Sequence, residues 1–265
     1  AKGTKRFFAC IGLNICSLII KVMPQAMIYG FANEMARLGF LIAGKHRRIA
    51  LEGLSAAFGK EKTASQIKRI AKDCFIFMAK SGVELMFLTQ RPALLKKRVS
   101  FIGKKNLDTA LSKGKGVILV SAHFGNFPLL MSKLSLEGYK IAGIIRFARD
   151  EKAEKIFHQK RQQVGIKTIY SQPRKTCVEE SIRTLRNNEL LFIPLDQNFG
   201  TGGIFVDFFG RKAATATGPV VLSLRTQAAI LPCFIVRSND DTHKIIFEPE
   251  FNLEKAETFE ETVFI

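Results

Sequence analysis

The segment SAHFGNFP, residues 121–128, contains the histidine with the best setting for chemistry in this sequence. It follows the short apolar run GVILVS, and its Gly125 and Asn126 are suited to end a strand and to begin a helix. Because functional groups of α/β proteins gather at the carboxyl ends of strands, His123 stands where a reacting group is expected. A neutral imidazole there can take the proton of an attacking hydroxyl, and helix N-terminal amides can stabilise an oxyanion. The pattern predicts a general base at His123.

The alternative for His123 is a structural histidine that is satisfied by local hydrogen bonds. The other histidines have settings with less to offer, since His46 lies in a basic run, His158 on a charged helix and His243 in a polar turn. Ser121 precedes His123 by two residues, but no G-x-S-x-G elbow surrounds it, so a serine hydrolase is disfavoured. The histidines and cysteines lack ligand spacing, and we expect no metal.

The elements that would position His123 alternate between strand and helix. Short apolar or β-branched runs predict strands at residues 99–102, 116–121, 141–145, 190–194, 204–208, 230–236 and 244–248. Helical patterns between them cover residues 126–137, 151–165, 175–187 and 218–227. This alternation predicts an α/β fold, in which a central, mostly parallel sheet is covered by helices on both faces.

The first third of the chain predicts helices. Apolar residues recur at three- and four-residue spacing over residues 25–88, and Thr63 with Gln66 resembles a capping box that starts a helix running towards Phe87. Lys2, Lys5 and Arg6 precede an apolar run at residues 7–23 that is shorter than the ~20 apolar residues of a membrane span. An interfacial helix, a short anchor and a buried helix all remain open, and we expect residues 1–30 to associate with a membrane.

The charge of the chain indicates an anionic partner. Lys and Arg number 41 against 23 Asp and Glu, which gives a net charge of +18. Nucleic acid, anionic lipid and an acidic carrier protein are the candidates. The basic residues are spread along the chain with no zinc-finger, RRM or helix-turn-helix signature, and the charge alone does not decide among the three. Taken together with the apolar run at residues 7–23, it leads us to expect an anionic membrane surface and no nucleic acid.

Several motifs resemble one known family. HFGNF at residues 123–127 is similar to the H-x-G-N-W-[DE] motif of the bacterial lipid A biosynthesis (late) acyltransferases and of the mycobacterial phosphatidylinositol mannoside acyltransferases, within the lysophospholipid/glycerolipid acyltransferase superfamily. HRRIALEGLSAAFG, IIRFARDEKAEKIFHQKRQQVG and FIPLDQNFGTGGIFVDFFGRKAATATGP also resemble segments of that family. The sequence departs from the family at Pro128, which stands where the motif has an acid.

The resemblance implies transfer of a fatty acyl group to a hydroxyl of a membrane glycolipid, such as a lipid A precursor. The donor would be a thioester of acyl carrier protein or coenzyme A, used as a co-substrate with no bound cofactor. The setting would be the cytoplasmic face of a bacterial inner membrane, with the protein peripheral or held by one N-terminal anchor. We expect residues 31–265 to form one acyltransferase domain, helical at 31–97 and sheet-containing at 98–265, and to be truncated at the C-terminus.

The site needs a replacement for the missing acid, because proline cannot orient the histidine or stabilise its charged form. Asp196, which follows the run at residues 190–194, is the first candidate, and Asp207 and Glu137 are weaker ones. A loop carboxylate bonded to backbone is the alternative for Asp196. The remaining residues expected to bind substrate are Gly125, Asn126, Arg146, Arg149, Arg161, Gln197, Thr217 and Gly218.

The three arginines of that set suit a phosphate or an acidic carrier, because the planar guanidinium bonds oxyanions through two N–H groups. Solvated surface charge is the alternative for each of them. Three rival functions also remain: a lipid-binding relative without catalysis, a thioesterase that uses the same histidine, and a nucleic-acid binder.

Overall fold

The computed structural model describes residues 18–20, 22–148, 150–198 and 200–253 of the 265-residue chain. The chain divides into two compact units, Ala1–Arg91 and Pro92–Ile265. Most of the apolar run at residues 7–23 lies outside the described residues. Within the described part, no helix combines the length and the apolar character that a membrane crossing requires.

The first unit is helical. It contains α2 (Gln25–Ile42), α3 (Gly44–Phe58) and α4 (Ala64–Leu88), and both α2 and α3 pack against α4. Phe40 of α2 meets Phe75 of α4 edge to face, with ring centroids 5.2 Å apart. The predicted capping box is confirmed, because Thr63 Oγ1 accepts a hydrogen bond from the Gln66 amide and Gln66 Oε1 accepts one from the Thr63 amide.

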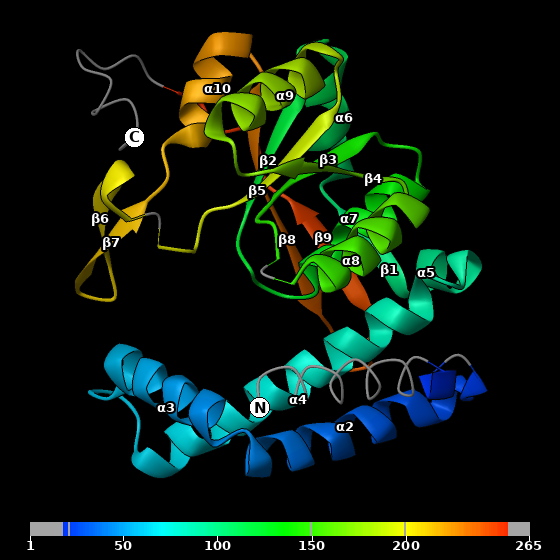
Figure 1. Ribbon diagram of the computed structural model, residues 1–265, viewed down its shortest axis with the longest axis vertical. Helices are drawn as coiled ribbons and strands as arrows, with labels where there is room; N and C mark the ends of the chain where they lie inside the picture. The colour runs from blue at the N-terminus through cyan, green and yellow to red at the C-terminus, as the bar shows by residue number, and fades with distance from the viewer. Residues whose placement is uncertain (1–17, 21, 149, 199, 254–265) are drawn as a thin grey trace. The chain divides into compact units, whose positions relative to one another are not determined.

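The second unit is built on a seven-stranded sheet (Figure 1). Its strand order is β1-β9-β8-β2-β5-β3-β4, and β8, β2, β5, β3 and β4 run parallel. β9 is antiparallel to β8, so β9 and its parallel neighbour β1 run in the opposite direction to the other five strands. The strand bounds are β1 Val99–Ile102, β2 Val117–Ser121, β3 Ile141–Ile145, β4 Ile166–Tyr170, β5 Leu190–Pro194, β8 Ala229–Arg237 and β9 His243–Phe247. The α/β fold with a mostly parallel sheet is confirmed.

Helices flank this sheet, and their connections define its crevice. The bounds are α5 Pro92–Arg98, α6 Lys104–Ser112, α7 Phe127–Leu136, α8 Glu151–Gln163, α9 Arg174–Arg186 and α10 Gly218–Thr226. The chain passes from β2 through α7 to β3, which lies on the β4 side of the sheet. It passes from β5 through α10 to β8, which lies on the β9 side. Because parallel crossovers are right-handed, the helices that follow β2 and β5 lie on opposite faces of the sheet. The carboxyl ends of these adjacent strands therefore form the topological switch point, where α/β proteins bind ligands.

The predicted strands are present, with two additional ones. β4 (IKTIY) lies at the sheet edge and has two consecutive polar residues, Lys167 and Thr168, so it lacks the continuous apolar run of a buried strand. β7 (Arg211–Thr215) is largely polar and pairs only with β6 (Ile204–Phe208), in a separate antiparallel hairpin. A short 3-10 turn, Gly200–Gly202, precedes β6.

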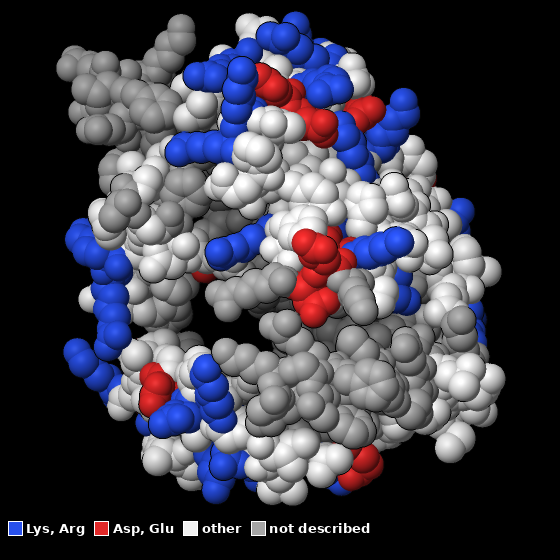
Figure 2. Space-filling model, in the orientation of Figure 1, with Lys and Arg blue, Asp and Glu red and all other residues white. Residues whose placement is uncertain are grey.

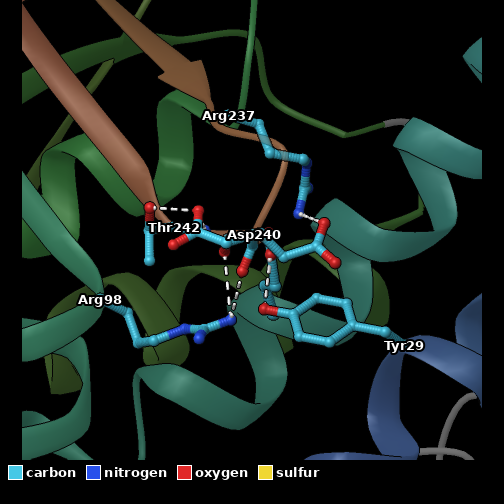
Figure 3. Close-up of polar contacts among 7 residues, drawn as sticks. Tyr29, Arg98, Arg237, Asp240 and Thr242 are labelled. Atoms are coloured by element: carbon cyan, nitrogen blue, oxygen red, sulfur yellow. Dashed lines mark hydrogen bonds and ion pairs between the residues drawn. The ribbon is translucent and has the colours of Figure 1, made fainter.

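Polar contacts hold the turn between β8 and β9 (Figure 3). Arg237 pairs with Asp241 across the turn at 3.2 Å, and Thr242 donates its hydroxyl to Asp240 Oδ1 at 2.7 Å. Arg98, the last residue of α5, donates to the backbone carbonyls of Asp240 and Asp241. These bonds tie the segment before β1 to the turn and fix the reversed edge of the sheet.

Candidate active site

His123 and Asp196 meet at the switch point of the sheet. β2 and β5 pair in parallel with Ser121 opposite Pro194, so the residues two positions beyond each strand end are also matched. His123 Nδ1 lies 2.8 Å from Asp196 Oδ1. This contact gives the imidazole a carboxylate partner, which Pro128 cannot supply. The side chains are 35% and 37% exposed, so the pair is open to a substrate while partly shielded from water.

The surroundings of Asp196 favour its ionised form over its protonated form. Burial alone would raise the pKa of Asp196, but hydrogen bonds from the side chain and backbone of His123 outweigh it and hold that pKa below its ordinary value. An ionised Asp196 accepts the Nδ1 proton, which leaves Nε2 of the neutral ring as the acceptor nitrogen. The tautomer is therefore the one that a general base needs.

Gln197 contacts the second ring nitrogen of His123. Its Nε2 lies 3.3 Å from His123 Nε2, and the tautomer set by Asp196 makes the Gln197 amide the donor. The consecutive residues of the D-Q pair thus engage the two nitrogens of one ring. The Gln197 amide also occupies the lone pair of Nε2 with which a general base would accept a proton.

The ring of His123 is fixed by aromatic packing that the sequence analysis did not assign. Phe127, the first residue of α7, meets His123 edge to face with centroids 4.9 Å apart. Phe127 in turn stacks on the buried Phe192 of β5, with an interplanar angle of 7°. The available signal was the aromatic position retained in the family motif.

The loop between His123 and α7 is held against β8. Gly125 has φ +64°, and a Cβ there would lie 1.9 Å from the carbonyl oxygen of Ile235, so a glycine is required. Asn126 is buried and is the N-cap residue of α7, as the sequence predicted, and its side chain makes no capping bond to that helix. The buried Ser121 hydroxyl makes no hydrogen bond within the described residues, so His123 does not activate it in this conformation.

The arginines expected to bind an oxyanion have different surroundings. Arg146 is exposed directly after β3, the strand next to β5. Arg149 lies outside the described residues. Arg161 of α8 pairs with the buried Glu154 and donates from Nε to Thr168 at 2.9 Å. On the face shown in Figure 2, Lys and Arg side chains lie in several places, some of them beside acidic side chains.

The other candidate residues have positions and partners of their own. Asp207 is on the separate hairpin and pairs with Lys212 at 3.0 Å. Glu137 follows the C-terminal end of α7, which is the far end of the helix from His123, and pairs with Lys133 at 2.7 Å. Thr217 and Gly218 begin α10, which packs on β2, but the Thr217 side chain makes no capping bond. Among the residues with described positions, no group of three or more His, Cys, Asp or Glu could hold a metal ion.

The fold and this pair define a class: an α/β protein with a histidine–carboxylate site for general acid–base chemistry at the switch point of its sheet. Comparison with known families makes the assignment more specific. The chain belongs to the bacterial lipid A biosynthesis acyltransferase family, whose profile matches residues 3–264. The resemblance seen in the motifs is confirmed at the level of the family.

Individual relatives are similar at a lower level. A phosphatidylinositol mannoside acyltransferase of Mycobacterium tuberculosis is 28% identical over 131 residues, 49% of this chain and 42% of that protein. A lipid A biosynthesis acyltransferase of Haemophilus influenzae is 28% identical over 162 residues, 60% of this chain and 50% of that protein. A phosphatidylinositol mannoside acyltransferase of Mycolicibacterium smegmatis is 23% identical over 219 residues, 81% of this chain and 70% of that protein. The chain matches about half the length of the first two relatives.

Proposed function

We propose that this protein transfers a fatty acyl group from a thioester to a hydroxyl of a membrane glycolipid, with His123 as the general base. The observation that carries the proposal is the contact between His123 Nδ1 and Asp196 Oδ1 at the switch point, in a chain of this family. The names of the relatives, which refer to lipid A and to phosphatidylinositol mannoside, support a glycolipid acceptor.

In the proposed reaction, the acceptor hydroxyl displaces the Gln197 amide from His123 Nε2 and donates its proton to that nitrogen. The oxygen attacks the thioester carbonyl, and a tetrahedral oxyanion forms. Asp196 stabilises the resulting imidazolium through Nδ1. The intermediate then expels the thiolate, which takes the proton from Nε2, so that the ester and the free thiol are the products and the histidine is again neutral. No acyl-enzyme is required.

Two further parts of the site have proposed roles. Backbone amides near Gly125 and Asn126, at the start of α7, are the proposed donors to the oxyanion, because a helix N-terminus carries unpaired N–H groups and partial positive charge. Arg146, exposed one residue beyond β3, is the proposed contact for a phosphate of the acceptor or of the donor. We propose acyl carrier protein or coenzyme A as the donor and the cytoplasmic face of an inner membrane as the setting.

The experiment compares the native chain with His123→Ala, Asp196→Asn and the control His46→Ala. His46 is exposed in the helical unit and has no proposed role. Each protein receives a labelled acyl thioester and a membrane glycolipid extract. Labelled glycolipid from the native chain and from the His46 control, with loss in the other two variants, would support the proposal.

Other results would identify the rival functions. Label that appears only as free fatty acid would indicate a thioesterase. Native protein that binds the lipid extract but turns over no acceptor, and whose lipid binding survives His123→Ala, would indicate a non-catalytic lipid-binding protein. Either result would overturn the proposed transfer.

A further inference from the structure

The hairpin of β6 and β7 leaves the sheet at the candidate site and returns to it. It begins eight residues after Asp196 and ends three residues before Gly218, where α10 starts. The two strands pair only with each other and form a sheet of their own (Figure 1). A partner that binds this hairpin is therefore brought close to the edge of the sheet where His123 lies.

Three phenylalanines of the hairpin are exposed. Phe205, Phe208 and Phe209 are 55%, 62% and 56% exposed, and the rings of Phe208 and Phe209 meet edge to face. Phe209 and Gly210 form the turn, both with positive φ, so the two aromatic residues stand at its tip. Apolar side chains grouped in this way on a protruding element commonly mark an interaction surface.

Basic residues follow the aromatic tip directly. Arg211 and Lys212 are exposed, and Lys212 pairs with Asp207 across the hairpin, so Arg211 gives the turn its net positive charge. Aromatic rings next to Arg or Lys are the pattern of membrane interfaces, where the ring enters the apolar layer and the cation stays at the headgroups. The net charge of +18 also favours an anionic surface.

The small area of the tip favours a bilayer over a protein partner. The exposed parts of three phenylalanines amount to ~300 Å². A stable protein interface needs about 800 Å² per partner. Insertion into a bilayer needs no minimum contact area, because each ring that leaves water contributes a favourable free energy by itself.

We propose that the tip of the β6–β7 hairpin, Phe205 with Phe208–Arg211, inserts into an anionic lipid bilayer and holds the candidate site at the membrane surface. The inference rests on the proposed function, because a glycolipid acceptor would reach His123 from that surface. This contact would be separate from the membrane association expected of residues 1–30.

The sequence contains no tryptophan, which makes the insertion directly measurable. Phe208→Trp places one fluorophore at the tip, and Phe157→Trp places one on α8, where Phe157 is 48% exposed. Both proteins are mixed with vesicles of phosphatidylcholine and phosphatidylglycerol, and with vesicles of phosphatidylcholine alone. Emission at position 208 should shift to the blue and be quenched by brominated lipid in the anionic vesicles, whereas position 157 should respond weakly. Equal responses at the two positions would overturn the proposal.

A triple variant tests the contribution of the rings. It carries Phe205→Ser, Phe208→Ser and Phe209→Asn, since asparagine tolerates the positive φ at position 209. Each half-exposed ring should contribute about fivefold to partitioning, so the triple variant should bind anionic vesicles on the order of 100-fold more weakly. Phe157→Ser is the matched control and should bind as the native chain does.

The acceptor can be supplied in two forms to separate this proposal from the proposed function. The triple variant should lose transfer to acceptor embedded in vesicles and keep transfer to acceptor dispersed in detergent. If the native chain transfers to neither form, the proposed function is wrong while the fluorescence still reports insertion. Native-like vesicle binding by the triple variant, or loss of a dimer in sedimentation instead of loss of vesicle binding, would show that the hairpin is no membrane contact.

Discussion

Asp196→Asn tests the site most directly because it keeps the size of the side chain and removes its charge. The imidazolium formed at His123 during transfer would then lack its counter-charge. Two unit charges ~4 Å apart interact by about 4 kcal/mol at an effective dielectric constant of ~20. The pair is more than a third exposed, so we reduce this to about 2 kcal/mol for solvent screening. Loss of the charge-assisted character of the hydrogen bond adds about 1 kcal/mol.

A total of about 3 kcal/mol corresponds to a fall in kcat of on the order of 100-fold. Initial rates with a labelled thioester and saturating acceptor measure it, and thermal unfolding confirms that the variant is folded. Asp207→Asn is the matched control, since Asp207 is an exposed carboxylate on the hairpin and should leave kcat within about twofold. If Asp196→Asn keeps nearly native kcat while His123→Ala abolishes transfer, Asp196 does not stabilise the imidazolium and the reasoning is wrong.

Three further changes test the elements around the pair. Gly125→Ala should lower the free energy of unfolding by about 2 kcal/mol or more in urea titrations, because its Cβ would collide with a β8 carbonyl; native-like stability would show that the loop has another conformation. Burial raises the pKa of Glu154, but bonds from the Ala148 amide and from Arg161 outweigh it and hold that pKa below its ordinary value. The stability that this lowered pKa contributes is present above the ordinary carboxyl pKa and is lost as the pH falls through the pKa of Glu154 in the folded protein. The melting temperatures of Glu154→Gln and of the native chain should therefore converge in acid. A difference in melting temperature that does not depend on pH would contradict this. Gln197→Ala should lower the KM of the acceptor about fivefold in kinetics with varied acceptor, because the hydroxyl no longer has to displace one amide hydrogen bond from His123 Nε2, whereas an effect on the donor KM alone would show that Gln197 does not occupy the acceptor position.

The sequence predicted the buried part of the sheet well because buried parallel strands are short, apolar and free of charge. The runs at residues 141–145 and 190–194 coincide with β3 and β5. β4 was missed because the consecutive polar residues Lys167 and Thr168, which point to opposite faces of this edge strand, interrupt its apolar residues. β7 was missed because its alanines and basic residues have low strand propensity and its pairing depends on β6.

The residues of the site differ in how far the sequence could specify them. His123 and Asp196 each follow an apolar strand, so both could be proposed, but their contact depends on β2 and β5 being neighbours, which the crossover order decides. The pairing of Arg161 with Glu154 could not be foreseen, because the two residues are seven positions apart on α8 and neither helix spacing of three nor of four joins them. It requires the side chains to meet beside Thr168 of β4.

The proline at position 128 is compatible with a working site for a geometric reason. In the family motif, the acid lies five residues after the histidine, and that position in this chain falls on the first turn of a helix. Here that turn is α7, and Pro128 is its second residue, a position whose amide has no helical partner, so the proline leaves the helix intact. The parallel register of β2 and β5 meanwhile brings the residue two positions beyond β5 level with His123. A carboxylate on that neighbouring strand reaches Nδ1 without any contribution from α7, so the loss of one acid does not by itself remove the charge that the imidazole needs.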